Sequence, residues 1–265
     1  MRGEAQSKSD RLAVLIDADN ANSNLIEPLL KEVAKYGTAH VKRIYGDWTG
    51  SQLSRWKDRL NKFAIQPIQQ FGYTTGKNST DSALIIDAMD LLYTKNFDGF
   101  CIVSSDSDFT RLASRIRESG LIVYGFGERK TPEAFVSACD RFIYTEILEQ
   151  LESTNETHLI KDNVISDKAD PKSSSSNKTT NKDNQKIKNN RNLLSLLKDA
   201  YEALTDDEDE WVHLGPFGTQ LTKLSSSFDP RNYGCKKLSD LVREVGIFET
   251  RKTDKTVQIK LKSTS

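Results

Sequence analysis

The stretch Leu12–Asn20, LAVLIDADN, joins a run of aliphatic residues to two aspartates and an asparagine that follow it directly. The apolar run LAVLI is typical of a strand that is buried on both faces, as in a parallel sheet. A second apolar run, GFCIVS at Gly99–Ser104, is followed in the same way by Asp106 and Asp108. Both runs therefore predict central strands of a parallel sheet, each with carboxylates at its end.

Further strands and helices alternate around these two runs. Three more apolar stretches are predicted strands: Ala39–Tyr45, Ile65–Phe71 and Leu121–Phe126. The spacing of apolar residues predicts helices over Asn22–Tyr36, Ser51–Phe63, Thr80–Tyr93 and Ser107–Glu118. We expect Gly37 and Gly120 to end the first and last of these helices as C-cap residues. Strands that alternate with helices indicate βαβ units with right-handed crossovers, and hence a three-layer α/β domain.

A polar segment separates this domain from the end of the chain. Between Leu151 and Asn190 the sequence has no aromatic residue, and Asp170–Asn190 consists mainly of Ser, Lys, Asn and Thr. Such a segment buries too little apolar surface to offset the entropy lost on ordering, so we predict a flexible linker over residues 151–190. The predicted domains are residues 1–150 and 191–265.

The second predicted domain has a different pattern. A helix over Asn190–Leu204 is followed by the acidic segment Asp206–Glu210, and a second helix is predicted from about Lys236 to Val245. Two short strand-like runs, Ile247–Arg251 and Thr256–Leu261, come last. Helices followed by a small β-hairpin favour an α+β module of the winged-helix kind.

Composition and charge limit the class of protein. The chain has 265 residues, with 38 Lys and Arg against 38 Asp and Glu, so its formal net charge is zero. Three scattered cysteines, Cys101, Cys139 and Cys235, are too few for a disulfide scaffold or a zinc site. No apolar run approaches the roughly 18 residues of a membrane span, and the first residues contain no apolar signal segment. We therefore expect a cytoplasmic protein that does not act at a membrane.

The carboxylates at the strand ends carry the chemical prediction. In an open parallel sheet, ligands bind beyond the carboxyl ends of the strands, where the strand order reverses. With the order 3-2-1-4-5, Asp17, Asp106 and Asp108 share one crevice, and Asp81 at the start of the third helix can join them. Clustered carboxylates repel one another unless a cation neutralises them, and oxygen ligands favour Mg²⁺ or Mn²⁺. Such an ion activates water for phosphodiester hydrolysis.

Each of these residues also has a simpler interpretation. An aspartate after a strand is equally typical of a helix N-cap. Asp87 either reaches the crevice or lies on a solvated edge of its helix. Arg43 lies within the predicted second strand, and Trp48 follows the end of that strand, near the rim of the crevice. The simpler interpretation of Trp48 is structural, as a cover over the edge of the sheet.

Three motifs in order, LIDADN, KNSTD with SALIIDAMDLL, and VSSDSDF, resemble the NYN domain, a PIN-like nuclease fold of the LabA type, over about Arg11–Leu148. The resemblance implies a metal-dependent ribonuclease whose acidic residues are Asp17, Asp81, Asp106 and Asp108. It also implies supporting roles for Asn20, Lys77 and Asp87, and we expect Ser105 to support the site as well. In the groove of such a nuclease, Arg43 and Trp48 would contact the phosphates and bases of single-stranded RNA. The sequence departs from the family pattern at Ser105, where a glycine commonly stands, and at Asp19, which replaces a small neutral residue.

The last part of the chain is similar to the OST-HTH/LOTUS domain over about Asn192–Lys262, through WVHL, FDPRNYGCKKLSDL, VGIFETR and TVQIKL. This resemblance implies a winged helix that binds RNA, in some members G-rich RNA, or a helicase partner in others. From Arg231 to the end, nine Lys and Arg stand against four acidic residues. We predict an RNA-binding face with Lys236, Lys237, Arg243 and Arg251; the alternative is a merely solvated charged surface. The neutral total charge is thus a sum of separate acidic and basic regions and does not exclude RNA.

The prediction is a ribonuclease that hydrolyses RNA phosphodiester bonds with Mg²⁺ or Mn²⁺ and carries a C-terminal RNA-binding module. One alternative is a non-catalytic RNA-binding or adaptor protein with the same fold. A second is a phosphatase of the HAD type, because DADN resembles a nucleophilic DxD loop. That chemistry requires a lysine before the last acidic motif, and Lys95 is the nearest candidate.

Overall fold

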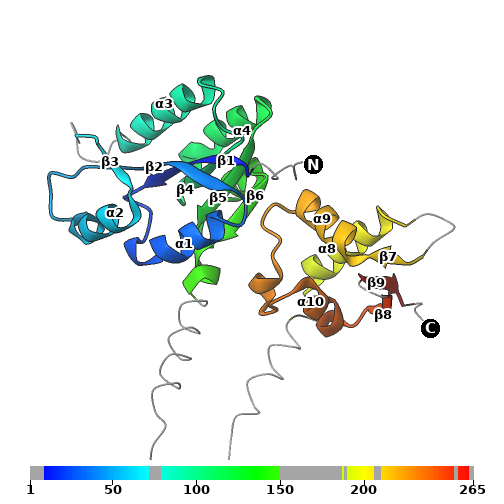
Figure 1. The fold of residues 1–265 in the computed structure, drawn as a ribbon. Coiled ribbons are helices and arrows are strands. Elements are labelled where there is room, and N and C mark those ends of the chain that lie inside the picture. Colours follow the sequence, from blue (N-terminus) through cyan, green and yellow to red (C-terminus); the bar gives the residue numbers. More distant parts are fainter. Residues whose placement is uncertain are drawn as a thin grey trace, which may run out of the picture. The chain divides into compact units, whose positions relative to one another are not determined.

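A computed structural model describes residues 9–71, 79–149, 187, 190–205, 210–253 and 256–262. These residues belong to two compact units, one within residues 1–159 and one within 160–265, which we describe separately (Figure 1). Most of the predicted linker, the predicted site residue Lys77 and all but the last residue of the acidic segment lie outside the described residues. Among the described helices, none is long and apolar enough to cross a membrane.

The first unit contains a parallel six-stranded sheet in the order β3-β2-β1-β4-β5-β6. Its strands are β1 (Arg11–Asp17), β2 (Thr38–Gly46), β3 (Gln66–Gln69), β4 (Gly99–Val103), β5 (Ile122–Gly127) and β6 (Arg141–Tyr144). β1 lies between β2 and β4, and its residue Val14 pairs with Lys42 on one side and Cys101 on the other. The predicted order of the first five strands is confirmed, whereas β6 at the edge was not predicted.

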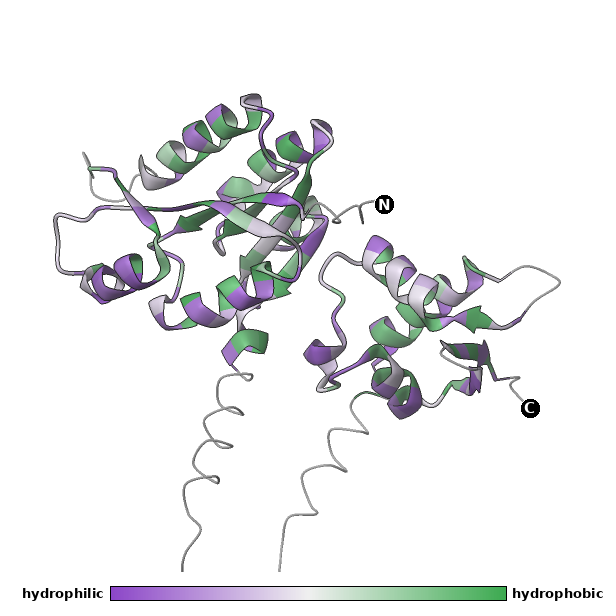
Figure 2. Ribbon diagram, in the orientation of Figure 1, coloured by the Kyte–Doolittle hydropathy of each residue, from purple (hydrophilic) through white to green (hydrophobic). Residues whose placement is uncertain are grey.

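Helices cover both faces of this sheet. They are α1 (Ile26–Val33), α2 (Lys57–Phe63), α3 (Ser79–Tyr93), α4 (Thr110–Glu118) and α5 (Glu133–Ala138), and short 3₁₀ turns η1 (Ser23–Leu25), η2 (Ser54–Trp56) and η3 (Ser107–Phe109) precede α1, α2 and α4. Alternate residues of a strand point to opposite faces. Accordingly Leu15 packs with α3, α4 and α5, while Val14 and Ile16 pack with α1 and α2. The predicted three-layer α/β architecture is confirmed, and α1 alternates in hydropathy as a helix with one buried side does (Figure 2).

The two predicted helix ends have different outcomes. Gly120 follows α4 with φ of +81°, the left-handed conformation that a glycine C-cap adopts. The prediction for Gly37 is wrong, because α1 ends at Val33 and Gly37 is not among the glycines with positive φ. A Cβ atom at Gly37 would lie 2.5 Å from the carbonyl oxygen of Asp10, so close approach of the chain before β1 requires the glycine there.

The second unit combines helices with a three-stranded antiparallel sheet in the order β7-β9-β8. Its elements are α8 (Arg191–Glu202), β7 (Val212–His213), α9 (Leu214–Leu224), η4 (Pro230–Tyr233), α10 (Leu238–Val245), β8 (Phe248–Thr253) and β9 (Thr256–Leu261). The buried ring of Phe248 lies 5.6 Å from Tyr201 and 5.7 Å from Phe217, which joins the hairpin to the helices. This arrangement agrees with the predicted winged-helix class.

Candidate active site

Three aspartates meet beyond the carboxyl ends of the central strands. Asp81 lies in the first turn of α3, and Asp106 and Asp108 lie in the segment between β4 and α4. Each offers one carboxylate oxygen, and these oxygens all lie within 4.8 Å of one another. We call Asp81, Asp106 and Asp108 the acidic cluster. The structure thus brings together three of the four carboxylates predicted to bind metal.

Local hydrogen bonds set the position of Asp106. Its Oδ1 accepts a hydrogen bond of 3.0 Å from the backbone N–H of Asp108, so Asp106 is the N-cap of η3. Its own backbone N–H donates to Ser104 Oγ at 3.1 Å. The capping interpretation therefore holds for Asp106, yet capping leaves its carboxylate in the acidic cluster. Both roles apply to the same residue.

Asp17, the fourth predicted ligand, is fully buried at the end of β1. Its carboxylate accepts hydrogen bonds from the backbone N–H of Asp19 at 3.0 Å, from Asn20 Nδ2 at 2.8 Å and from Ser104 Oγ at 2.8 Å. Ser104 thereby connects the loop after β1 with the loop that holds Asp106. Ser104 was not predicted as a site residue. Its position between an apolar strand and two aspartates is the sequence feature that could have indicated a role at the site.

Burial and neighbouring negative charges raise the pKa of two carboxylates in this region, Asp81 and Asp19. Partial burial raises the pKa of Asp81 to about 6, and the negative charges of Asp17, Asp106, Asp108 and Asp19 add to the effect. Partial burial and then the charge of Asp17 also raise the pKa of Asp19, which accepts a hydrogen bond from Thr80. Crowded carboxylates of this kind fit a hard divalent cation, since its charge removes their repulsion and its preferred ligands are oxygens.

The raised pKa of Asp81 predicts a pH effect on the metal-free protein. An ordinary aspartate titrates near pH 4 in the unfolded chain, so the stability that Asp81 contributes is present below pH 4 and is lost as the pH rises through about 6. Solvent screening at this half-buried group reduces the effect to about 1 kcal/mol, or about 3 °C in melting temperature. Asp81→Asn should therefore melt about 3 °C higher than wild type at pH 8 in EDTA, and no higher at pH 4. Melting curves of both proteins at the two pH values measure this, and equal differences at both would contradict it.

The other supporting residues fall into two groups. Asn20 and Ser105 lie in the loops around the site: Asn20 donates to Asp17, and the buried Ser105 accepts a hydrogen bond of 2.9 Å from the backbone N–H of Glu128. Asp87 instead bonds to the side chains of Arg43 and Tyr45 on β2. Asp87 and Arg43 thus form an ion pair with each other, an alternative that the sequence analysis did not consider.

Trp48 follows β2 and is partly buried against the helices of one sheet face. Its indole Nε1–H donates to the carbonyl of Ile68 on β3 at 3.1 Å, and its backbone N–H donates to Gln69 Oε1 at 2.9 Å. These contacts agree with the structural alternative, in which Trp48 covers the edge of the sheet. A role in RNA stacking stays a prediction.

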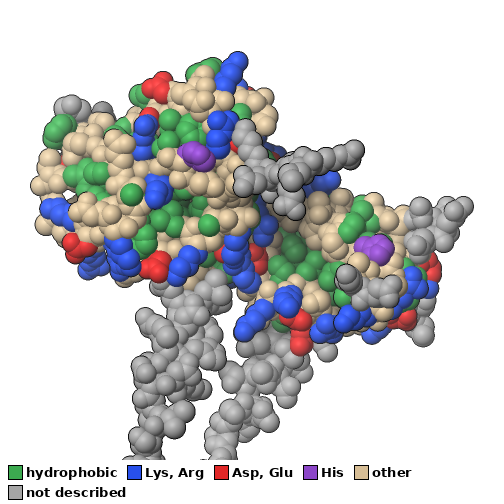
Figure 3. Space-filling view, viewed as in Figure 1, with side chains coloured by type: hydrophobic (Ala, Val, Ile, Leu, Met, Phe, Trp, Pro, Cys, Tyr) green, Lys and Arg blue, Asp and Glu red, His purple; other side chains and the backbone are tan. Residues whose placement is uncertain are grey.

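The predicted RNA-binding residues of the second unit are exposed. Lys236 and Lys237 directly precede α10, and Arg243 on α10 lies 3.5 Å from Asp240. Arg251 on β8 stacks on Trp211, with 4.2 Å from its guanidinium to the ring centre, and donates to Gln258 at 2.7 Å. Lys and Arg side chains mix with acidic ones on the surface over α10 (Figure 3). Lys236 and Lys237 are therefore better placed for phosphate than Arg251, whose guanidinium is already engaged.

The phosphatase alternative requires a lysine beside the acidic residues. Lys95 follows α3 and precedes β4, so it lies at the amino edge of the sheet, whereas the acidic cluster lies beyond the carboxyl ends of the strands. The geometry therefore does not support Lys95 in that role.

Comparison with known proteins gives two family matches. The model of the NYN domain matches residues 11–152, and the model of the OST-HTH/LOTUS domain matches residues 187–259. No curated protein matches the chain. One similar solved structure is described as a protein of unknown function from Vibrio parahaemolyticus; it is 17% identical, the match covers 52% of this chain and 94% of that one, and the TM-score is 0.45.

Proposed function

Because the chain belongs to the NYN domain family over residues 11–152, we propose that it is a metal-dependent ribonuclease that hydrolyses phosphodiester bonds of single-stranded RNA. The NYN domain is part of the PIN-like nuclease superfamily, and the OST-HTH/LOTUS domain is an RNA-binding domain. The observation that carries the proposal is the acidic cluster, with oxygens of three carboxylates within 4.8 Å of one another.

The chain's own residues have distinct roles in this proposal. The acidic cluster would hold Mg²⁺ or Mn²⁺, which supplies an activated water and stabilises the charge of the reacting phosphate. Asp17 adds its negative charge beside the cluster and holds Asn20 and Ser104 in place through hydrogen bonds of 2.8 Å each. Such outer partners orient the ligands that touch a metal.

The second unit would raise the local concentration of RNA at the first. A tethered module converts a second binding event into an intramolecular one. A protein partner for the second unit is the alternative, and cytoplasmic location stays part of the proposal.

Lys236 and Lys237 test this role of the second unit. We expect the double variant Lys236→Gln/Lys237→Gln to bind single-stranded RNA several-fold more weakly than wild type, because two phosphate contacts are lost. The slope of log K against log salt should fall by about 1.4, which is about 0.7 for each contact. A filter-binding titration in EDTA from 50 to 200 mM salt measures both. The matched control is Lys198→Gln/Lys223→Gln, two exposed lysines on α8 and α9; an equal loss in that control would mean that general charge, not this face, binds RNA.

The direct test of the proposed function is an assay of the full chain with end-labelled single-stranded RNA. Cleavage with Mn²⁺ that EDTA abolishes is the expected result. Calorimetric titration with Mn²⁺ is run in parallel. No cleavage, whether or not the ion binds, would contradict the ribonuclease, and RNA binding without cleavage would identify an adaptor.

A further inference from the structure

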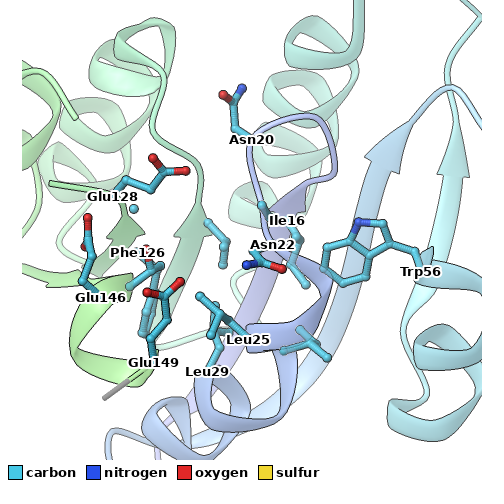
Figure 4. A pocket seen from close by; sticks show the side chains of 15 residues that line it. Ile16, Asn20, Asn22, Leu25, Leu29, Trp56, Phe126, Glu128, Glu146 and Glu149 are labelled. Atoms are coloured by element: carbon cyan, nitrogen blue, oxygen red, sulfur yellow. The ribbon is translucent and has the colours of Figure 1, made fainter. Parts of the chain in front are cut away.

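A cavity of about 340 Å³ opens at the carboxyl ends of β1, β4 and β5 (Figure 4). Ile16, Val103 and Phe126, near the ends of these strands, form part of its lining, and Trp56 comes from η2. Its volume lies in the range of small-ligand sites. Several of the lining residues are large and apolar, so the cavity suits a flat, apolar ring.

The polar residues around this cavity carry no positive charge. Among the described residues, Glu128, Glu146 and Glu149 line the cavity, and no Lys or Arg does. A phosphate or carboxylate would therefore be repelled. Lys130 pairs with Glu128 at 2.9 Å, so the glutamate whose acceptor a ligand N–H would use is Glu146.

Glu146 has one carboxylate oxygen that lacks such a donor. Its Oε1 accepts a hydrogen bond of 2.8 Å from the backbone N–H of Arg129. Its Oε2 is buried and has no hydrogen-bond partner among the described residues. Buried polar atoms are normally paired, because leaving one without a partner costs free energy. Glu146 lines the cavity and is only partly buried as a residue, so a small rotation of its side chain would bring Oε2 to a ligand N–H, which would supply the missing bond.

The loops of the acidic cluster also form the rim of the cavity. Asn20 lines the cavity and donates to Asp17 at 2.8 Å. Glu128 lines it as well, and its backbone N–H donates to Ser105, the residue before Asp106, at 2.9 Å. A nucleotide whose base enters the cavity therefore has the cluster's own loops beside its sugar and phosphate.

We propose that the cavity binds a guanine base of the RNA substrate, an inference that rests on the proposed function for the identity of the ligand. Guanine carries two adjacent donors, N1–H and N2–H. Glu146 Oε2 would accept one of them, and Oε1, which already accepts from the Arg129 N–H, has a second lone pair for the other. Asn22 also lines the cavity and uses its Oδ1 for the backbone N–H of Asn24 at 3.0 Å, so its Nδ2–H is oriented by that bond and can donate to guanine O6. Proteins commonly recognise RNA bases by stacking and by hydrogen bonds to this edge.

The first experiment measures binding of neutral nucleosides to the full chain by ligand-observed NMR. Guanosine is expected to bind at least about tenfold more tightly than inosine, which lacks N2–H, or adenosine, since a good two-bond contact to a base gives discrimination of this size. Glu146→Gln should remove this preference, because its amide places a donor where guanine needs an acceptor. The matched control is Glu133→Gln, the same change at an exposed position on α5, which should keep it. The comparison among nucleosides uses the wild-type chain, so it does not depend on how the variant folds.

Equal binding of guanosine and adenosine would overturn the proposed guanine pocket, and so would an unchanged guanosine preference in Glu146→Gln. Binding of agmatine, a guanidinium cation, in place of guanosine would assign the cavity to cationic ligands and overturn it as well. A cleavage assay with end-labelled single-stranded RNA, run beside the nucleoside titrations, separates this inference from the proposed function. RNA cleavage without any nucleoside preference would support the ribonuclease and contradict the guanine pocket. Guanosine preference without any RNA cleavage would support the guanine pocket and contradict the ribonuclease.

Discussion

Asp106→Asn and Asp81→Asn should each lower Mn²⁺-dependent cleavage of single-stranded RNA by a factor of at least about 100. Loss of one electrostatic group that acts on the transition state typically costs a factor of 10²–10³ in rate. Each substitution replaces a charged oxygen ligand of the acidic cluster with a neutral amide of nearly the same shape. The measurement is the initial rate of cleavage at saturating Mn²⁺, with the melting temperature of each variant measured alongside.

The matched control for this prediction is Asp90→Asn. Asp90 lies on α3, the helix that carries Asp81, and its side chain is exposed. We expect the rate of this variant to stay within about twofold of wild type, because surface substitutions away from special features have small effects. If Asp106→Asn and Asp81→Asn cleaved as fast as Asp90→Asn, the acidic cluster would not be the catalytic centre.

The central part of the fold was predictable because strong local patterns specify it. β1 and β4 are continuous apolar runs, and α1 and α4 each carry a clear stripe of apolar residues. α5 and β6 were missed since they have only six and four residues, too few for a period to be recognised. Gly37 shows another limit: its role depends on the carbonyl of Asp10 in a neighbouring segment, which no local pattern reveals.

The site was predictable to the level of residue type and strand end, but not to the level of individual contacts. The order of the strands predicted that the loops with Asp17 and Asp106 share one crevice, and the position of Asp81 at the start of its helix predicted that it could join them. Asp17 differs from Asp81 and Asp106 in its contacts: it is fully buried, and Ser104 bonds both to its carboxylate and to the backbone of Asp106. Neither feature could be predicted from the sequence pattern. The cavity could not be predicted, because Asn22, Trp56 and Glu146 come from distant parts of the chain.

Asp17→Ala should lower the free energy of unfolding of the first unit by about 2–4 kcal/mol. The carboxylate is fully buried and accepts three hydrogen bonds, from Asp19, Asn20 and Ser104. Hydrogen bonds to a charged group contribute about 1.5–3 kcal/mol each. In the variant, water can hydrogen-bond to the donors of Asp19 and Asn20, which lie at the surface, so the net loss is smaller than the sum of the three bonds. Urea unfolding followed by tryptophan fluorescence measures the change. We also expect slow RNA cleavage, since both loops lose their common anchor.

The sign of the stability change separates the role of Asp17 from that of Asp81. In EDTA at pH 8, Asp81→Asn removes a repelled charge and should stabilise the protein, whereas Asp17→Ala removes a hydrogen-bonded one and should destabilise it. Both variants lose activity for different reasons: the first lacks a ligand in an intact site, and the second lacks the anchor that positions the ligands. If Asp17→Ala unfolded at the same urea concentration as wild type, its hydrogen bonds would not stabilise the loops, and the anchoring role of Asp17 would be wrong. If Asp81→Asn stabilised the protein and Asp17→Ala destabilised it, the two carboxylates would have different roles although both lie near strand ends. The difference between them is burial: the fully buried carboxylate anchors the loops, and the partly exposed one is available to bind a metal.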